Sequence, residues 1–524
     1  MNEILNSLFI QLSKRAEKVD RQVLIDSFVD VGPLLSVLST IDNQVLYGRR
    51  GTGKTHAFVY LSEAVRKRGD ISVYVDLRTI GSTGGLYSDT SFPLAERATR
   101  LLVDTMAAMH EELLAEAIED PSLNLSEVGP ILDELANAIT EVVVMGPVKQ
   151  QVEEESQEKH GEKLNISLRA GLSGVGVKTE GGFSVEDSSK ASLSLTTEGP
   201  AIHRVHFGRV GAVLAQLTKS LKNKRIWLLL DEWSAIPIEL QPYLADLIRR
   251  ALFPSKAISV KIAAIEKRSK FQLAMKEGDY VGIELGGDAS ADLNMDDFMV
   301  FDNDEEKAIR FFRTLVFRHI KTLASHADIT TPDSETELVR TAFTQDNVFR
   351  EFVRAAEGIP RDAFYILSLA AQRNVGSPIT MDTVRKSSKT WYQRDKEVAV
   401  SANVQALALL HWIIDEVIAH RRSRAFLLKR GVSSDLIDSL FDSRVIHLLK
   451  RNISAHDEPG VRYDVYKIDY GCYVDLLSTI KAPKGLFELD DGTYVEVPPD
   501  DYRAIRRAIL DIEKFQKRTS EGVC

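Results

Sequence analysis

The sequence GRRGTGKT, residues 48–55, fits the pattern G-x-x-x-x-G-K-[ST] of a phosphate-binding loop. Its glycines allow the backbone to bend so that successive N–H groups converge on phosphate oxygens. Lys54 supplies a positive charge for those oxygens, and the Thr55 hydroxyl is a ligand for Mg²⁺. The sequence therefore predicts ATP and Mg²⁺ as cofactors. The candidate nucleotide contacts are Gly48, Arg49, Arg50, Gly51, Thr52, Gly53, Lys54, Thr55 and His56.

The residues on both sides of this loop suit a phosphate site. Residues 44–47 are predicted to end a short strand, and residues 56–68 carry apolar side chains at helical spacing. The loop then precedes a helix N-terminus, whose dipole favours an anion. A glycine-rich turn without a ligand is the alternative.

A second stretch supplies the carboxylates that a nucleotide site needs. Residues 226–230 (IWLLL) form an unbroken apolar run, typical of a strand buried on both faces of a parallel sheet. Asp231 and Glu232 follow this run. We expect Asp231 to hold Mg²⁺ directly or through water, and Glu232 to act as the general base for the attacking water. A solvated strand end is the alternative for this acidic pair.

Two further strands are predicted, at residues 71–77 and 260–265. Strands that alternate with helices indicate a doubly wound parallel sheet with the nucleotide at the C-terminal edge of the strands. The predicted fold class is therefore α/β: a P-loop NTPase parallel sheet with a helical lid, a C-terminal winged helix and a β-rich insertion.

These motifs, GRRGTGKT and LLLDEW, occur with a later GIPRD at residues 358–362. The three together resemble the AAA+ ATPases that include origin-recognition and replication-initiator proteins, and the neighbouring STAND signalling ATPases. The resemblance covers about residues 20–480. It implies a helical lid after the nucleotide domain, and it assigns Arg361 as the sensor-2 arginine that contacts the γ-phosphate. A helix-starting turn, with Pro360 near the first helical position, is the alternative.

Two further expectations follow from the same resemblance. It implies an arginine finger near the end of the helix after the acidic strand, where this chain has Arg249 and Arg250; two surface arginines are the alternative. It also implies a neutral polar sensor-1 residue at the end of the 260–265 strand, where this chain has Glu266. Because a carboxylate would repel a γ-phosphate, either the alignment slips or Glu266 pairs with a neighbouring cation. This departure bears on the hydrolysis rate more than on nucleotide binding.

Composition limits the class of protein. The chain has 524 residues and a formal net charge of −10, so several domains are expected and indiscriminate nucleic-acid binding is disfavoured. The two cysteines, Cys472 and Cys524, predict neither a disulfide framework nor a cysteine-rich metal site. No apolar window is long enough to span a bilayer, and the first residues do not resemble a signal peptide. The predicted location is cytoplasmic, without a membrane partner.

Five segments are expected along the chain: a helical lead-in at 1–40, the ATPase domain at 41–290, a helical lid at 291–398, a winged helix at 399–480, and a hairpin with a basic helix at 481–524. The second of them, the ATPase domain, contains an insertion at about residues 95–200. Within this insertion, residues 164–197 alternate between apolar and polar side chains around glycines, which favours a β-hairpin or small sheet over a disordered loop.

The winged-helix prediction rests on three helices followed by a β-hairpin. The helices are expected at residues 404–420, at 422–429 and from 433 or 434 to about 445, and the hairpin strands at 446–454 and 462–468. Residues 401–480 carry ten Lys and Arg and ten Asp and Glu. The predicted recognition helix carries Asp435, Asp438 and Asp442, with Arg444 near its end. Because DNA affinity depends on phosphate neutralisation, this favours a protein-contact or regulatory role. The best nucleic-acid candidate is the basic C-terminal helix, for which a solvated face is the alternative. Its cations are Arg503, Arg506, Arg507, Lys514, Lys517 and Arg518.

The sequence thus predicts an ATP-binding and ATP-hydrolysing AAA+/STAND-like switch. The candidate catalytic residues are Lys54, Glu232 and Arg361, and the candidate Mg²⁺ ligands are Thr55 and Asp231. Nucleotide state would control assembly of a homo-oligomer or binding of an effector protein, and analogy with similar ATPases suggests bacterial antiphage defence. Two alternatives stay open: a DNA-binding replication-initiator-like ATPase, and a nucleotide-dependent scaffold that does not hydrolyse ATP.

Overall fold

The computed structural model describes residues 1–80, 87, 89–139, 142–144, 148–153, 163–169, 178–184, 192–197, 201–203, 205–222, 224–275, 278–300, 304–419, 425–432, 434–454, 460–477 and 508–520. They form two compact units. One consists of Met1–Arg68, Lys261–Ser269 and Ala289–Cys524, and the other of Gly69–Val260 and Lys270–Asp288. The predicted C-terminal hairpin and three of the predicted basic residues, Arg503, Arg506 and Arg507, lie outside the described residues.

The fold is mixed α/β, with a parallel five-stranded sheet in the order β13–β1–β10–β9–β2. Every residue of β1, β9 and β10 is buried, and for β9 the apolar run IWLLL predicts a strand covered on both faces. Four of the five strands match the strands predicted from sequence; β13 (SADLN) was missed because it has no apolar run. The strands are β1 (Gln44–Tyr47), β2 (Ile71–Asp76), β9 (Ile226–Asp231), β10 (Ile258–Ala264) and β13 (Ser290–Asn294).

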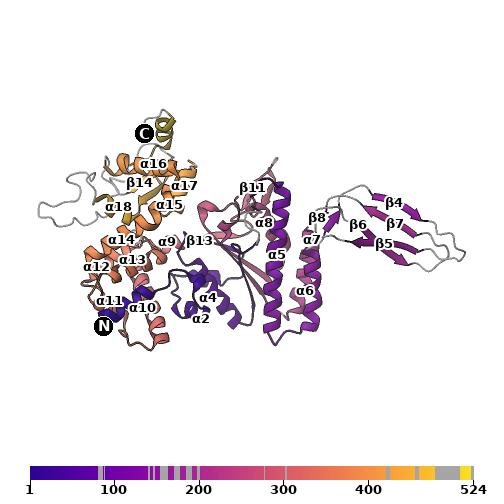
Figure 1. The fold of residues 1–524 in the computed structure, drawn as a ribbon, viewed down its shortest axis with the longest axis horizontal. Helices are drawn as coiled ribbons and strands as arrows, with labels where there is room; N and C mark the ends of the chain where they lie inside the picture. Colours follow the sequence, from indigo (N-terminus) through magenta and orange to yellow (C-terminus); the bar gives the residue numbers. More distant parts are fainter. Residues whose placement is uncertain are drawn as a thin grey trace. The chain divides into compact units, whose positions relative to one another are not determined.

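The first unit begins with helices that surround the phosphate-loop helix α4. Helix α4 buries Ala57, Phe58, Leu61 and Val65, which recur at helical spacing. Helix α2 packs against α4 and α10, and α1 packs against α10, α11 and α13 (Figure 1). The elements are α1 (Asn2–Gln11), η1 (Ala16–Lys18), α2 (Arg21–Ser27), α3 (Leu34–Leu38) and α4 (Lys54–Lys67).

A bundle of helices follows β13 in the same unit. Asp304, Ser334 and Thr380 cap three of these helices, because each side chain accepts a hydrogen bond from a first-turn backbone N–H. Their apolar faces share one core with α1, which includes Phe9 and Phe312. The helices are α9 (Met295–Met299), α10 (Glu305–Ala327), α11 (Glu335–Ala342), α12 (Asp346–Ala355), α13 (Pro360–Arg373), α14 (Met381–Trp391), η6 (Tyr392–Lys396) and α15 (Glu397–Ser401).

The C-terminal part of the first unit contains an antiparallel sheet in the order β14–β16–β15. The prediction of three helices here was wrong at residues 422–429: the described part is strand β14, whose short buried run AFLL pairs with β16. We call the described residues 425–477 the C-terminal module. The elements are α16 (Val404–Ile413), η7 (Ile414–Ala419), β14 (Ala425–Lys429), α17 (Asp435–Asp442), β15 (Ile446–Ser454), β16 (Arg462–Ile468), α18 (Tyr470–Leu477) and α20 (Ile512–Ser520).

The second unit holds β2 and β9 side by side, with Asp76 level with Asp231. Helices α5 and α6 pack together (Figure 1), and α5 also packs on β2. The helices and short strands are α5 (Leu94–Glu119), α6 (Leu125–Ile139), α7 (Phe207–Ser220), η2 (Trp233–Ala235), α8 (Gln241–Leu247), η3 (Ile248–Leu252), β11 (Gln272–Ala274) and β12 (Tyr280–Gly282). No helix among the described residues is long and apolar enough to cross a membrane.

Between α6 and α7, the described residues form antiparallel strand pairs: β3 with β8, β4 with β7, and β5 with β6. The pairing of β5 with β6 agrees with the hairpin that the alternation in residues 164–197 predicts. The strands are β3 (Val142–Val144), β4 (Val148–Glu153), β5 (Lys163–Arg169), β6 (Lys178–Ser184), β7 (Ser192–Thr197) and β8 (Ala201–His203).

Candidate functional site

The loop between β1 and α4 adopts a backbone that requires its glycines. Gly51 and Gly53 have φ angles of +86° and +102°, in the left-handed region that side chains with a Cβ rarely enter. A Cβ on Gly48 would lie 2.6 Å from Thr52 Oγ1. The Thr52 hydroxyl in turn donates to the carbonyl of Arg49 at 2.9 Å. The three glycines are therefore needed for this loop shape, as the motif predicts.

Lys54 and Thr55 stand at the first turn of α4, directly after the loop. The Lys54 side chain is 8% exposed, and its Nζ donates to the carbonyls of Gly48 at 2.9 Å and Arg49 at 3.1 Å. The ammonium group is thus held inside the curve of the loop, beside the positive end of a helix dipole. This arrangement suits an anion.

Arg361 lies directly against the loop. Its backbone N–H donates to the Gly51 carbonyl at 3.2 Å, and a Cβ on Gly51 would lie 2.6 Å from the Arg361 Cβ. The Arg361 Nε is buried and has no hydrogen-bond partner among the described residues. Burial and the neighbouring Arg444 guanidinium lower the pKa of Arg361. Helix α13 begins at Pro360, as the helix-start interpretation of GIPRD predicts, and that start places the arginine beside the loop.

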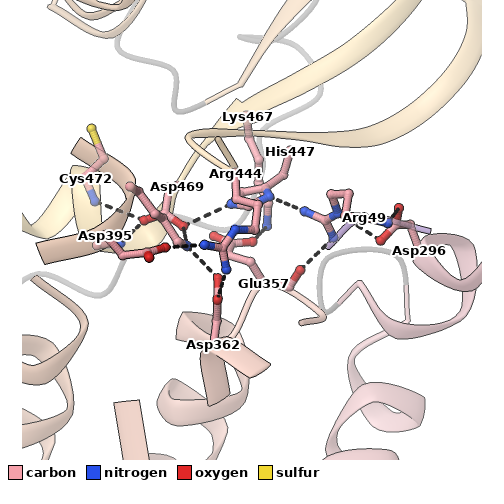
Figure 2. A network of polar contacts seen from close by, with 12 residues as sticks. Arg49, Asp296, Glu357, Asp362, Asp395, Arg444, His447, Lys467, Asp469 and Cys472 are labelled. Atoms are coloured by element: carbon pink, nitrogen blue, oxygen red, sulfur yellow. Dashed lines mark hydrogen bonds and ion pairs between the residues drawn. The ribbon is translucent and has the colours of Figure 1, made fainter. Parts of the chain in front are cut away.

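Arg49, although part of the phosphate loop, is held by protein groups. Its side chain is 2% exposed. The Nε donates to Asp296 Oδ1 at 2.8 Å, and Nη2 donates to the Glu357 carbonyl at 2.9 Å. The Nη1 bonds to Nδ1 of His447, on strand β15 (Figure 2). The guanidinium of Arg49 therefore anchors the loop to these protein groups.

The next arginine and the end of β10 both face the C-terminal module. Arg50 Nε lies 3.7 Å from Asp442 of α17. Glu266 begins the short helix η4 (Glu266–Arg268) after β10, and its carboxylate forms two 2.5 Å contacts with the guanidinium of Arg451. Asn294, at the end of β13, donates to the same carboxylate at 3.4 Å. The cation expected beside Glu266 is therefore Arg451.

His56, a candidate nucleotide contact, is directed toward α2. Its Nε2 lies 2.5 Å from the carbonyl of Leu24, and its ring packs on the rings of Phe28 and His319. Burial lowers the pKa of His56. This histidine is therefore part of the packing between α2, α4 and α10.

The carboxylates of the second unit are fixed by their neighbours. Asp231 is fully buried; its Oδ2 accepts from the Tyr74 hydroxyl and its Oδ1 from the Glu232 backbone N–H, both at 2.8 Å. Burial and Asp231 raise the pKa of Tyr74, so Tyr74 stays a donor. Glu232 has a left-handed φ of +56°, and its Oε1 lies 3.8 Å from Arg78, which also pairs with Asp76. No cluster of three or more His, Cys, Asp or Glu suited to a metal is found among the described residues.

The two arginine-finger candidates both pair with Asp246. Arg249 lies 2.9 Å from Asp246 and stacks over Tyr280 at 4.7 Å from the ring centre. Arg250 lies 2.7 Å from the same carboxylate, and its side chain is 53% exposed. Within the described chain, both arginines therefore serve local ion pairs.

A buried network of charges joins helices α13 and η6 to the C-terminal module (Figure 2). Lys396 contacts Asp469 at 2.5 Å and Asp362 at 2.8 Å, and Arg444 pairs with Asp362. His447 completes the connection to Arg49, because its Nε2 lies 3.0 Å from Asp469 Oδ2. Burial, and the charge of Arg49, lower the pKa of His447 to about 3, so the ring is neutral and bonds through both nitrogens.

Sequence reasoning missed the residues that hold the site from outside the motifs: Tyr74, Asp296, Asp442, His447 and Arg451. Tyr74 could have been suggested by its place on the strand beside β9. The others have no local signal.

The cations expected on the C-terminal helix are partly engaged: Lys514 and Arg518 stack on Trp412, and Arg518 also lies 3.8 Å from Glu416.

Comparison with known proteins adds little to this site. No family model matches the chain. Over 88 residues the chain is 35% identical to the 80.3 kDa protein of transposon gamma-delta from Escherichia coli (strain K12), and that match spans 16% of this chain and 13% of that protein. The structure of the Aeropyrum pernix ORC1 protein in complex with DNA is similar at 15% identity and a TM-score of 0.30, covering 87% of this chain and 95% of that one.

Proposed function

We propose that this chain binds ATP·Mg²⁺ at the phosphate loop and hydrolyses it, as an ATPase of the AAA+ type. The observation that carries the proposal is Arg361, whose buried Nε has no hydrogen-bond partner among the described residues and whose side chain lies against Gly51. A buried donor without a partner is costly, and a phosphate oxygen at the loop would satisfy it. Its position also agrees with the sensor-2 role that the resemblance implies.

The remaining roles follow from the chemistry of the side chains. Lys54 and the N–H groups at the start of α4 would neutralise phosphate oxygens. Thr55 and Asp231 have the oxygen donors that Mg²⁺ prefers. When bound, Mg²⁺ would neutralise charge on the phosphates. Glu232 would accept a proton from the attacking water as general base.

Two observations favour hydrolysis over the alternatives. Arg451 neutralises Glu266, so the carboxylate at the sensor-1 position no longer argues against γ-phosphate binding. The aspartates of α17 pair with cations of the same unit, which does not suit insertion of this helix into DNA. A winged-helix role for the C-terminal module, oligomer assembly, an effector partner and antiphage defence stay predictions from the sequence.

Phosphate release by the full chain tests this function, with and without double-stranded DNA. We expect turnover by the native chain and none by Lys54→Ala. Glu232→Gln should bind ATP normally but turn over about 10²- to 10⁴-fold more slowly, because it lacks the general base. Unchanged turnover in Glu232→Gln would refute the hydrolytic role of this residue. DNA-stimulated turnover would favour the initiator alternative, and ATP binding without turnover would favour the scaffold.

A further inference from the structure

The acidic face of α17 pairs with one cation of the phosphate loop and two cations of η4. Asp442 lies between two arginines, 3.7 Å from Arg50 of the loop and 3.1 Å from Arg268 of η4. Asp438, one turn earlier, lies 3.6 Å from Lys267. Two carboxylates thus neutralise three cations, one of which belongs to the loop itself.

These pairs are open to solvent. The side chains of Arg50, Lys267 and Arg268 are 51%, 38% and 43% exposed, and those of Asp438 and Asp442 are 31% and 23% exposed. Exposed ion pairs at such distances are individually weak and are screened by salt. A ligand with several negative charges can therefore displace them.

Other contacts between the C-terminal module and the same unit are buried. His447 bonds to Arg49, and both side chains are almost fully buried. Lys467 pairs with Glu357 at 2.5 Å, with neither side chain exposed. Breaking buried pairs of this kind is strongly unfavourable. The module therefore has a buried attachment and an exposed, charge-dependent one.

We infer that Asp438 and Asp442 form a latch that competes with the polyphosphate of a bound nucleotide for Arg50, Lys267 and Arg268. This inference rests on the proposed function, since it concerns the affinity of the same loop. The phosphates attract the three cations and repel both aspartates, so binding loosens α17 while the buried contacts hold the module. Because coupling is reciprocal, a closed latch lowers nucleotide affinity by the factor by which nucleotide weakens the latch.

The test is the affinity of the full chain for ATP·Mg²⁺ and for inorganic tripolyphosphate, by calorimetry. The variant Asp438→Asn with Asp442→Asn removes both latch charges without removing bulk. We expect it to bind both ligands about threefold to tenfold more tightly, a range consistent with three weak exposed pairs. The matched control is Asp435→Asn on the same helix, since Asp435 is exposed and forms no ion pair among the described residues. This control should bind within twofold of the native chain.

A charge swap distinguishes the latch from a general effect of net charge on nucleotide affinity. Asp438→Lys places a cation opposite Lys267 and should tighten binding as the double variant does. Adding Lys267→Asp restores an opposite pair at the same place and should return the affinity toward that of the native chain. In the native chain, ATP should increase the hydrogen exchange of residues 435–442, while residues 446–449 of β15 stay protected.

Failure of the latch and failure of the proposed function give different results. If neither the native chain nor any variant binds ATP or tripolyphosphate, the proposed nucleotide site itself is wrong and the latch falls with it. If all bind with equal affinity, or if ATP protects residues 435–442, nucleotide binding stands and the latch is overturned.

Discussion

Replacing Gly51 with alanine tests the contact between the phosphate loop and Arg361. At a φ of +86°, an alanine costs about 1–2 kcal/mol of backbone strain. The new methyl would also lie 2.6 Å from the Arg361 Cβ, roughly 1 Å closer than ordinary carbon contacts allow. Arg361 must therefore move away, and its 3.2 Å hydrogen bond to the Gly51 carbonyl is lost.

The matched control is Gly431→Ala. Gly431 has a φ of +87°, and no atom of the described residues lies within 4 Å of the place where its Cβ would stand. Gly431→Ala should lose about 1–2 kcal/mol of unfolding free energy, and Gly51→Ala at least as much, because the clash with Arg361 adds to the same backbone strain. Only Gly51→Ala should also lose ATP affinity, by at least about tenfold, because misplacing a positioning group by about 1 Å can cost as much as 10²-fold.

The assay is ATP titration of both variants beside thermal unfolding, repeated in an Arg361→Ala background. If the methyl acts through the guanidinium, Gly51→Ala should have a much smaller effect on affinity in that background, which a double-mutant cycle measures. Equal ATP affinities for Gly51→Ala and Gly431→Ala would show that the contact between the loop and Arg361 has no bearing on nucleotide binding.

Three further predictions concern buried titratable groups. Lys396→Met should lower the unfolding free energy by about 3–5 kcal/mol, because Asp469 and Asp362 lose the buried cation that lies 2.5 Å and 2.8 Å from them. A loss below about 1 kcal/mol in urea unfolding would contradict this expectation. Burial, and then the neighbouring imidazole, lower the pKa of His319 to about 3, below the value of about 6.5 expected when unfolded. The stability that neutral His319 contributes is complete above pH 6.5 and is lost as pH falls toward 3. His319→Gln should therefore flatten the pH dependence of the melting temperature between pH 6.5 and 3, and an unchanged slope would contradict this. Burial raises the pKa of Cys472 to about 12, so in a Cys524→Ser background this thiol should react with iodoacetamide only after denaturation; rapid labelling of the native chain would show otherwise.

The central strands and the phosphate loop could be predicted from sequence because their causes are local. An unbroken apolar run such as IWLLL is stable in a strand that is covered on both faces, and β9 is such a strand. Gly51 and Gly53 likewise indicate where the loop backbone adopts positive φ angles. Strand β13 lacks such a run, and its pairing with β1 provides the stabilisation that its own residues do not signal.

The chemistry around the loop could not be predicted in the same way because its partners are distant in sequence. Glu266 and Arg451 are 185 positions apart, and no local pattern relates them. Arg49 was a candidate nucleotide contact by position alone, whereas the fold supplies Asp296 and His447 to hold it. The error at residues 422–429 has a similar cause, since β14 becomes a strand by pairing with β16.

Equilibrium titration of ATP·Mg²⁺ into the full chain and into Lys54→Ala tests whether the loop at residues 48–55 binds nucleotide. Lys54 is enclosed by the loop carbonyls of Gly48 and Arg49, so its removal takes away the cation at the centre of the site. We predict saturable binding by the native chain and at least about tenfold weaker binding by Lys54→Ala, the loss expected for one charge-assisted contact of about 1.4 kcal/mol or more. Equal binding by both proteins, or no binding by the native chain, would contradict the account.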